Sequence, residues 1–367
     1  RELGQWPEAN AAWRKAVELR PGYADAWQNL GLGLECQYRI EEALTCHERV
    51  VQLRPQDSTA HRYLGMVRQD SGRLEAARES YLNALRLAPK DAEAHWQLFS
   101  LMAAGGEFPQ AWQEHEWRWQ LKWRTTPKRE FAKPTWDGTD LAGHTILLYS
   151  EQGFGDAIQA VRYVPLLRAR GARVLLWCPP ELVSLFQSVS AAAEIFSQLT
   201  KSATFNVHAP VMSLPLLFAT TLTTIPREVP YLHAPKNSLL LLPPLAGSGL
   251  KVGLVWCGSL SQPNDRRPVP FECLPPLLGI GNVQFYSLQT GAAAADLKRA
   301  ATARRILDLS PHLADFAATA SAIEQLDLVI TIDTSVAHLG GAMGIPTWIL
   351  TAHAPDWRYH LERRDNP

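Results

Sequence analysis

The chain has 367 residues, which is long enough for two or three domains. Its 36 basic and 36 acidic residues balance, so the composition gives no overall reason to expect nucleic acid or an anionic membrane as a partner. Five scattered cysteines without paired metal spacing are typical of reduced thiols, and the leucine run at residues 239–242 is too short to span a bilayer. No signal peptide is visible, and we therefore expect a soluble, cytoplasmic protein.

The first third of the chain repeats itself with a period of 34 residues. The repeated positions are Ala9, Ala43, Ala77 and Ala111; Pro21, Pro55 and Pro89; Trp27, His61 and His95; and Leu30, Leu64 and Leu98. The pattern resembles the tetratricopeptide repeat, in which the Ala lets two helices approach, the Leu fills their seam and the Pro ends the second helix. It predicts an α-solenoid over residues 1–123, without the first helix of repeat one and degenerate at Phe99 and His115. Such an array is either purely architectural or a concave surface for a protein or peptide partner.

Two other features of this region have competing interpretations. Histidines recur at regular repeat positions, so we expect packing residues and not metal ligands; they are His47, His61, His95 and His115. Residues 112–136 interleave tryptophans with arginines and lysines, a pattern that can bind single-stranded nucleic acid by stacking. Acidic residues dilute the positive charge, so a last helix followed by a linker at 124–143 is the favoured interpretation, and no nucleic-acid partner is expected.

A first α/β domain is expected over residues 144–240. Its elements are a strand at 144–150, a glycine loop at 151–156, a helix at 157–170 and a strand at 172–177. Gly153 and Gly155 supply the first two glycines of a dinucleotide fingerprint, but Ile158 occupies the third position. Since no ribose-binding acid follows the second strand either, the pattern argues against NAD.

A second α/β domain is expected over residues 251–367, after a hinge at 241–250 that contains two prolines and two glycines. Three good N-cap residues follow its strand at 326–332: Asp333, Thr334 and Ser335. A helix that begins at the carboxyl edge of a sheet can bind an anion through its free backbone N–H groups and its dipole. The turn is therefore either an anion site or an ordinary βαβ corner, and two domains joined by a hinge would place a ligand cleft between them.

Five segments together resemble one family. They are residues 148–162, 252–258, 264–270, 287–291 and 332–339. In order and spacing they are similar to the bacterial tetratricopeptide-repeat glycosyltransferases related to the lipopolysaccharide heptosyltransferases. The resemblance implies an α + α/β fold in which the solenoid precedes two Rossmann-like domains in the GT-B arrangement. It also implies an inverting transfer that needs no metal, with a nucleotide-diphosphate sugar as donor and no other cofactor.

The resemblance further implies roles for individual residues. On the donor side these are Asp333, Thr334, Ser335, Val336, His338, Arg266, Arg267 and Gln289. Backbone N–H groups of the turn would hold the diphosphate, with Arg267 as the first cation and Arg266 as the second. His338 would donate a hydrogen bond, and Asp333 would cap the turn or hold His338. The acceptor-side residues are Gln152, Gly153, Gly155, Gln159 and His208. Asp156 would be the general base, although an Asp at a helix N-terminus can also be a simple cap.

The chain departs from the family pattern at Thr290, where Lys is expected, and at Asn206, where an acid is expected. It also stops at Pro367, so it is either a partial chain or one with an altered closure of the cleft. The resulting prediction is an inverting glycosyltransferase whose repeats recruit a protein or peptide acceptor. The alternatives are a decayed, nucleotide-sugar-binding scaffold and a transferase that acts on a glycan or lipid-linked acceptor.

Overall fold

The computed structural model describes residues 6–124, 126–189, 192, 194–200, 203–236, 240–243, 249–259, 265, 267–299, 305–352 and 356–359. The chain forms two compact units. The repeat unit comprises Arg1–Thr125, Thr220–Thr223 and His353–Pro367, and the α/β unit comprises Thr126–Ala219 and Thr224–Ala352. Among the described residues, no helix is long and apolar enough to cross a membrane.

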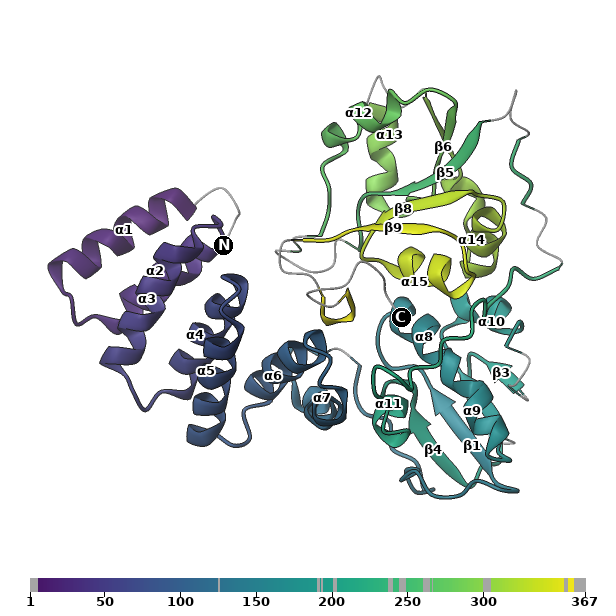
Figure 1. Cartoon of the computed structure of the whole chain (residues 1–367), viewed down its shortest axis with the longest axis horizontal. Coiled ribbons are helices and arrows are strands. Elements are labelled where there is room, and N and C mark those ends of the chain that lie inside the picture. The colour runs from purple at the N-terminus through teal and green to yellow at the C-terminus, as the bar shows by residue number, and fades with distance from the viewer. Residues whose placement is uncertain are drawn as a thin grey trace. The chain divides into compact units, whose positions relative to one another are not determined.

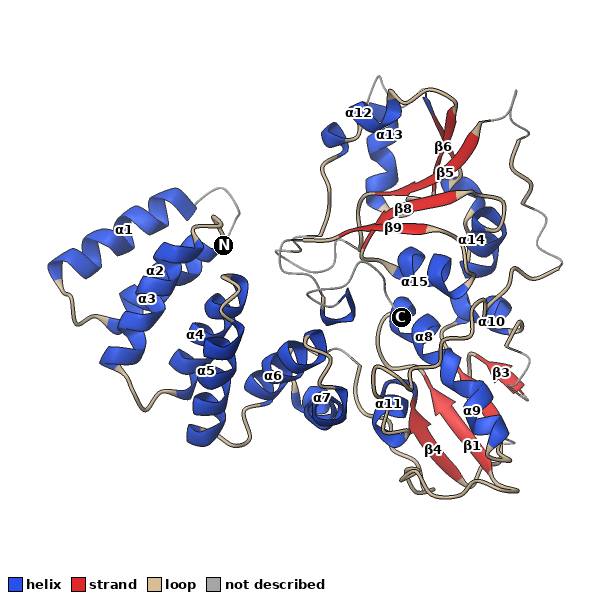
Figure 2. Cartoon of the chain, viewed as in Figure 1, coloured by secondary structure: helices blue, strands red, loops and turns tan. Residues whose placement is uncertain are grey.

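The repeat unit is a series of helical hairpins (Figures 1 and 2). Its helices are α1 (Trp6–Leu19), α2 (Ala24–Glu35), α3 (Ile40–Leu53), α4 (Ser58–Asp70), α5 (Leu74–Leu87), α6 (Ala92–Ala104), α7 (Phe108–His115) and the 3₁₀ helix η1 (Glu116–Gln120). The pairs α2–α3, α4–α5 and α6–α7 start 34 residues apart, as the sequence predicts. The expected repeat solenoid is therefore confirmed.

Two repeated contacts explain why these residues form hairpins. A Cβ added to Gly31 would lie 2.6 Å from Nε2 of His47, and one added to Gly65 would lie 2.4 Å from Cε1 of Tyr81, so each glycine makes room for a ring on the second helix. The other contact is a ring N–H that donates to a proline carbonyl six residues earlier: Trp27 to Pro21 (3.0 Å), His61 to Pro55 (3.0 Å) and His95 to Pro89 (3.1 Å). The packing role predicted for the repeat histidines is thus confirmed.

The tryptophan-rich segment uses its rings within the repeat unit. Trp117 stacks on His95 at 3.8 Å between ring centroids, and Trp119 receives the guanidinium groups of Arg118 and Arg124 at 4.6 and 4.4 Å. Trp123 is the exposed member, at 55%. Because aromatic faces that are already stacked cannot also stack on bases, these contacts favour the packing interpretation over a nucleic-acid surface.

The α/β unit contains two parallel sheets, with strand orders β3-β2-β1-β4 and β7-β6-β5-β8-β9 (Figure 2). The strands are β1 (Thr145–Tyr149), β2 (Arg173–Trp177), β3 (Glu194–Phe196), β4 (Val207–Pro210), β5 (Leu250–Val255), β6 (Val283–Ser287), β7 (Ile306–Asp308), β8 (Leu328–Ile332) and β9 (Thr347–Leu350). The helices are α8 (Phe154–Ala160), α9 (Val164–Ala169), α10 (Pro180–Phe186), α11 (Leu214–Leu217), α12 (Pro275–Leu278), α13 (Asp296–Arg299), α14 (Phe316–Ile323) and α15 (Ser335–Ala342), with short 3₁₀ turns between them. The predicted parallel α/β region is confirmed.

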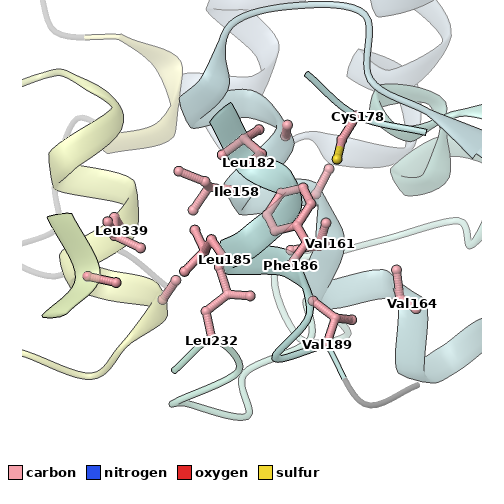
Figure 3. Packing of buried hydrophobic residues seen from close by; sticks show 14 of the residues in the cluster. Ile158, Val161, Val164, Cys178, Leu182, Leu185, Phe186, Val189, Leu232 and Leu339 are labelled. Atoms are coloured by element: carbon pink, nitrogen blue, oxygen red, sulfur yellow. The ribbon is translucent and has the colours of Figure 1, made fainter. Parts of the chain in front are cut away.

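One hydrophobic core joins the two sheets. Ile158 of α8 and Leu185 of α10 belong to the same buried cluster as Leu339 of α15 (Figure 3). Ile323 of α14 belongs to it too. The two predicted α/β domains therefore pack as a single unit, and their relation to the GT-B arrangement stays a prediction.

The predicted linker and hinge are both anchored. Within 124–143, Trp136 is buried and its backbone N–H donates to the carbonyl of His208 (2.8 Å), so this segment adds to the edge of β4. Its prolines suggest a linker, yet an extended proline-containing chain can also line a sheet edge. In the hinge, Gln325 accepts from the N–H of Leu242 (3.0 Å) and donates to the carbonyl of Leu240 (2.6 Å). Hinge residues 244–248 lie outside the described residues.

Candidate ligand-binding site

The strand orders place the two predicted turns at special points of their sheets. In the first sheet β1 lies between β2 and β4, and in the second sheet β5 lies between β6 and β8, so the strand order reverses at β1/β4 and at β5/β8. Ligands of open α/β sheets bind outside the carboxyl ends of the strands at such switch points. The loop before α8 follows β1, and the turn before α15 follows β8. The loop before α8 and the turn before α15 therefore both lie where the topology favours a ligand.

These two turns meet. Helix α8 packs against α15, and a Cβ added to Gly155 would lie only 2.4 Å from Cδ2 of His338. Gly155 is buried at this contact, so a residue with a side chain would push the imidazole away. The structure thus brings together the loop predicted for the acceptor side and the turn predicted for the donor side.

The turn after β8 is organised around Asp333. Thr334 holds the N-cap position of α15, with φ −143° and ψ 173°, and its hydroxyl lies 3.1 Å from that of Thr331. The Asp333 carbonyl accepts from Nη1 of Arg267 at 3.0 Å, and its carboxylate lies 3.9 Å from Nε2 of His338. Asp333 therefore lies between Arg267 and His338, and its role of holding His338 stays a prediction. Ser335 and Val336 follow as the first residues of α15, where backbone N–H groups have no intrahelical acceptor.

Arg267 is held in place by a carboxylate that sequence reasoning missed. Nε and Nη2 of Arg267 donate to the two oxygens of Asp265 at 2.9 and 2.8 Å, and its backbone N–H donates to the same group at 3.0 Å. The bond from Arg267 holds the pKa of Asp265 below its usual value. The Arg267 side chain is still 37% exposed, so an anion could reach the guanidinium. The sequence feature that could have indicated this contact is Asp265 itself, a carboxylate two residues before Arg267. Arg266 lies outside the described residues.

Gln289 has a positioning role in the structure. Its amide oxygen accepts from the backbone N–H groups of Trp256 (3.1 Å) and Cys257 (2.9 Å), and its amide nitrogen donates to the carbonyls of Cys257 (3.0 Å) and Thr290 (2.9 Å). The residue is buried, and these four bonds use its two donors and two acceptor positions. Gln289 thus connects the end of β5 to the end of β6. Its side-chain amide has no hydrogen-bonding position left for the nucleotide-sugar that it was predicted to contact.

Asp156 caps its own helix. It is the third residue of α8, and its Oδ2 accepts from the backbone N–H of Gly153 at 2.9 Å. The capping interpretation is confirmed, and the role as a general base stays a prediction. Gln152 and Gln159, on the loop and on the helix, are half-buried.

His208 does not belong to the acceptor-side loop. It lies on the edge strand β4, where it pairs with Leu147 of β1, and its ring packs against Phe131 and Tyr149 at centroid distances of 4.5 and 6.0 Å. Because strand residues alternate between faces, it lies opposite to Leu148, which packs in the core with α8. Burial lowers the pKa of His208. The prediction that placed His208 at the acceptor side was therefore wrong.

One further carboxylate lies at a switch point. Glu151, directly after Ser150 at the end of β1, is buried, and sequence reasoning gave it no role. Among the residues that the structure describes, no three His, Cys, Asp or Glu side chains come together as a metal site. What the site offers an incoming molecule is a helix N-terminus and a guanidinium, which suit an anion.

Comparisons with known proteins reach both units but identify no family. No family model matches the chain. Protein FlbA of Caulobacter vibrioides is 27% identical over 287 residues, which cover 70% of this chain and 48% of the relative. The chain thus spans about half the length of the curated relative it matches, and a match of this extent continues beyond the repeats.

Solved structures match over about a third of the chain. MamA is 21% identical with a TM-score of 0.31, covering 32% of this chain and 70% of its own. MamA from Desulfovibrio magneticus RS-1 is 25% identical with a TM-score of 0.30, covering 31% and 64%. YrrB, described as a TPR protein with an unusual peptide-binding site, is 21% identical with a TM-score of 0.29, covering 33% and 62%.

Proposed function

We propose that the α/β unit binds a nucleotide-diphosphate sugar at the two facing turns and transfers the sugar to a hydroxyl of a protein or peptide that the repeats recruit. One observation carries the proposal: the contact of Gly155 with His338 sets two switch-point turns against each other. A transferase with two α/β halves in the GT-B arrangement needs this geometry, because donor and acceptor must meet between the halves. The motif resemblance described above supports the choice of reaction.

The donor would be held by its diphosphate. The N-terminus of α15 provides the N–H groups of Thr334, Ser335 and Val336, and one such helix end contributes roughly 0.3–2 kcal/mol. The Arg267 guanidinium, oriented by Asp265, would add a charge-assisted hydrogen bond to a phosphate oxygen. Nε2 of His338, near Asp333, would donate a further hydrogen bond.

The transfer itself is a single displacement. The acceptor oxygen forms a bond to the anomeric carbon from the face opposite the nucleotide, and the bond from that carbon to the diphosphate oxygen breaks. The nucleoside diphosphate leaves with the electron pair, so the anomeric configuration inverts. Asp156 takes the proton of the acceptor hydroxyl as the bond forms.

The variant Asp156→Asn separates catalysis from capping. The amide oxygen of Asn can still accept from the N–H of Gly153, so we expect an unchanged free energy of unfolding. Loss of the base should lower the transfer rate by about 10²–10⁴-fold, measured as release of nucleoside diphosphate in the presence of acceptor. Transfer at the wild-type rate would show that Asp156 is only a cap.

The donor site is tested by binding of UDP, GDP and ADP in titration calorimetry. Arg267→Ala should weaken binding of whichever nucleotide binds by at least about tenfold, because a charge-assisted contact is lost. Arg299→Ala is the matched control, since that side chain is 74% exposed and pairs with Asp296 on α13. Equal affinities of wild type and Arg267→Ala would move the phosphate site elsewhere.

A second candidate function is a scaffold that binds a nucleotide-sugar without turnover. The engagement of Asp156 as a cap favours it, because a carboxylate that already accepts from Gly153 is a weaker candidate for a base. In this case the repeats would bind protein partners, and the α/β unit would bind the nucleotide-sugar without reacting with it. A screen of nucleotide-diphosphate sugars for transfer and hydrolysis separates the two functions, since any turnover excludes the scaffold.

A further inference from the structure

The last repeat departs from the repeat pattern at positions that share one contact. Phe99 on α6 stands where the earlier repeats have Gly31 and Gly65. Trp112 on α7 stands 34 residues after Arg78, a charged residue of α5. Both departures place a large aromatic ring in the last repeat, and at the positions of Gly31 and Gly65 such a ring would collide with His47 or Tyr81.

Both rings contact Trp357, far along the chain. Trp357 opens the 3₁₀ helix η8 (Trp357–Tyr359), which lies against α6 and is 8% exposed. Its ring centroid lies 5.2 Å from that of Phe99, 5.5 Å from that of Trp112 and 6.3 Å from that of Phe108, each at a T-shaped angle. Such edge-to-face pairs add about 0.5–1.5 kcal/mol each beyond the burial of apolar area.

A second distant segment completes the same end of the array. Nε1 of Trp112 donates to the carbonyl of Thr220 at 2.9 Å, in a buried bond. A Cβ added to Gly106 would lie 2.6 Å from Cδ1 of Leu222, so the turn between α6 and α7 also packs on this segment. Thr220–Thr223 and η8 both belong to the repeat unit, although the chain on either side of Thr220–Thr223 and the chain that leads up to His353 belong to the α/β unit.

We propose that η8 and Thr220–Thr223 form an internal cap that completes the last repeat. The end of a solenoid exposes the apolar face on which another repeat would stack, and it needs a cap to stay folded and soluble. Here the chain supplies that cap from two segments, one that follows α11 and one that follows β9. This inference does not depend on the proposed transferase activity.

The cap has a consequence for recruitment. A further repeat or a partner helix cannot stack on α6 and α7 where Trp357 already lies, so partners are left with the other faces of the array. The cap also follows β9, which pairs with β8, the strand that leads to Asp333. Folding of the last repeat therefore needs two segments from much later in the chain, one after α11 and one after β9.

Hydrogen–deuterium exchange of the full-length chain tests the cap. Trp357→Ala should accelerate exchange of peptides from α6 and α7 by at least about tenfold, because a buried ring is lost, while peptides from α2 and α3 keep their rates. Trp357→Phe should retain most of the protection. The control is Trp348→Ala, whose ring is 64% exposed on β9 and should change nothing in α6 or α7.

A reciprocal variant keeps the test decisive if Trp357→Ala folds poorly. Phe108→Ala should accelerate exchange of the peptide that contains Thr220–Thr223, since the cap and the repeat protect each other. Unchanged exchange of α6 and α7 in Trp357→Ala would overturn the proposal. Equal acceleration in α2 and α3 would overturn it as well, because Trp357 would then support the whole array and not its end.

Discussion

Contacts between the paired helices of a repeat are local and recur, whereas those at the candidate site join distant residues and occur once. The pairs Gly31–His47 and Gly65–Tyr81 are the same contact made in successive repeats. By contrast, the bond from Arg267 to the carbonyl of Asp333 spans 66 residues. A repeat array distributes its stability over similar interfaces, so losing one contact is a small fraction of the whole. The α/β unit holds its site through single polar contacts, and their loss should be felt more strongly.

The largest effect that we expect from removing a single contact of the site is the loss of stability on replacing Gln289. Gln289→Ala leaves two buried N–H groups and two carbonyls at the ends of β5 and β6 without their partner. We expect the free energy of unfolding to fall by about 3–5 kcal/mol, because each buried orphan costs on the order of 1–3 kcal/mol and water can replace some of them.

Urea unfolding followed by circular dichroism measures the Gln289 effect. Gln284→Ala on β6 is the control, since its half-buried side chain donates to the carbonyl of Phe285 and makes no second bond within the described part of the chain. If Gln289→Ala cost no more than Gln284→Ala, the site would not depend on this tie.

The next effect tests the contact between the two turns. Gly155→Ala places a methyl group against His338, and relieving that overlap should cost about 1–3 kcal/mol in unfolding free energy. Gly341→Ala is a control on α15 itself, where an added Cβ meets no atom of the described residues within 4 Å. This exposed helical position should gain up to about 1 kcal/mol from the better helix propensity of Ala. A neutral Gly155→Ala would mean that the turns do not meet.

The same contrast explains what sequence could predict. The 34-residue period determines which residues face each other in every hairpin, so the array and the packing histidines were predictable from Ala43, Ala77 and their equivalents. The two turns were predictable because strand, loop and helix are consecutive. The face of His208 was not, because β4 is short and buried on both sides, so no alternation marks its outward residues.

Other parts of the site and fold depend on distant contacts that no local pattern records. The hydrogen bond between Gln289 and Trp256 spans 33 residues, and the cap contact between Trp357 and Phe99 joins residues that are 258 positions apart. A segment with prolines and glycines, such as 124–143, has the same sequence pattern whether it is a free linker or lines a sheet edge. The hydrogen bond from Trp136 to His208 shows which of the two it is, and no local pattern records that bond. Sequence predicted the elements of the site and left their mutual contacts open.

A third effect concerns acid and the last repeat. Burial, together with the positive charges of Arg118, Arg358 and Arg124, holds the pKa of His115 well below its usual value. The folded protein thus keeps this ring neutral where the unfolded chain takes up a proton, so His115 costs no stability above about pH 6.5, and stability falls as the pH drops below it. The loss should be about 1.4 kcal/mol per pH unit until the folded ring titrates. Glu116, which pairs with Arg118, reduces the local positive charge without cancelling it.

Comparing variants isolates the contribution of His115. His115→Phe should remove this part of the acid sensitivity, while His144→Phe, at an exposed ring in the α/β unit, should leave it in place. The measurement is the free energy of urea unfolding at pH 7.5 and pH 5.5 for each protein. Equal pH dependence in wild type and His115→Phe would contradict a neutral, buried His115.

The smallest expected effect on stability comes from giving the helix α2 the N-cap residue that α4 and α6 have. Asp57 and Asp91 hold the N-cap positions of α4 and α6, and each carboxylate accepts from two backbone N–H groups of its helix. Tyr23 stands at the equivalent position before α2, where none of the described side chains caps the helix. Tyr23→Asp should therefore add about 0.5–1 kcal/mol to the stability of the array, and Asp57→Ala should remove about as much or slightly more. Because a repeat array is built from similar units, the gain should appear as slower hydrogen exchange in α2, with unchanged exchange in the α/β unit. If α2 of the Tyr23→Asp variant were no better protected than α2 of the wild type, the repeats would be less equivalent than their shared period implies.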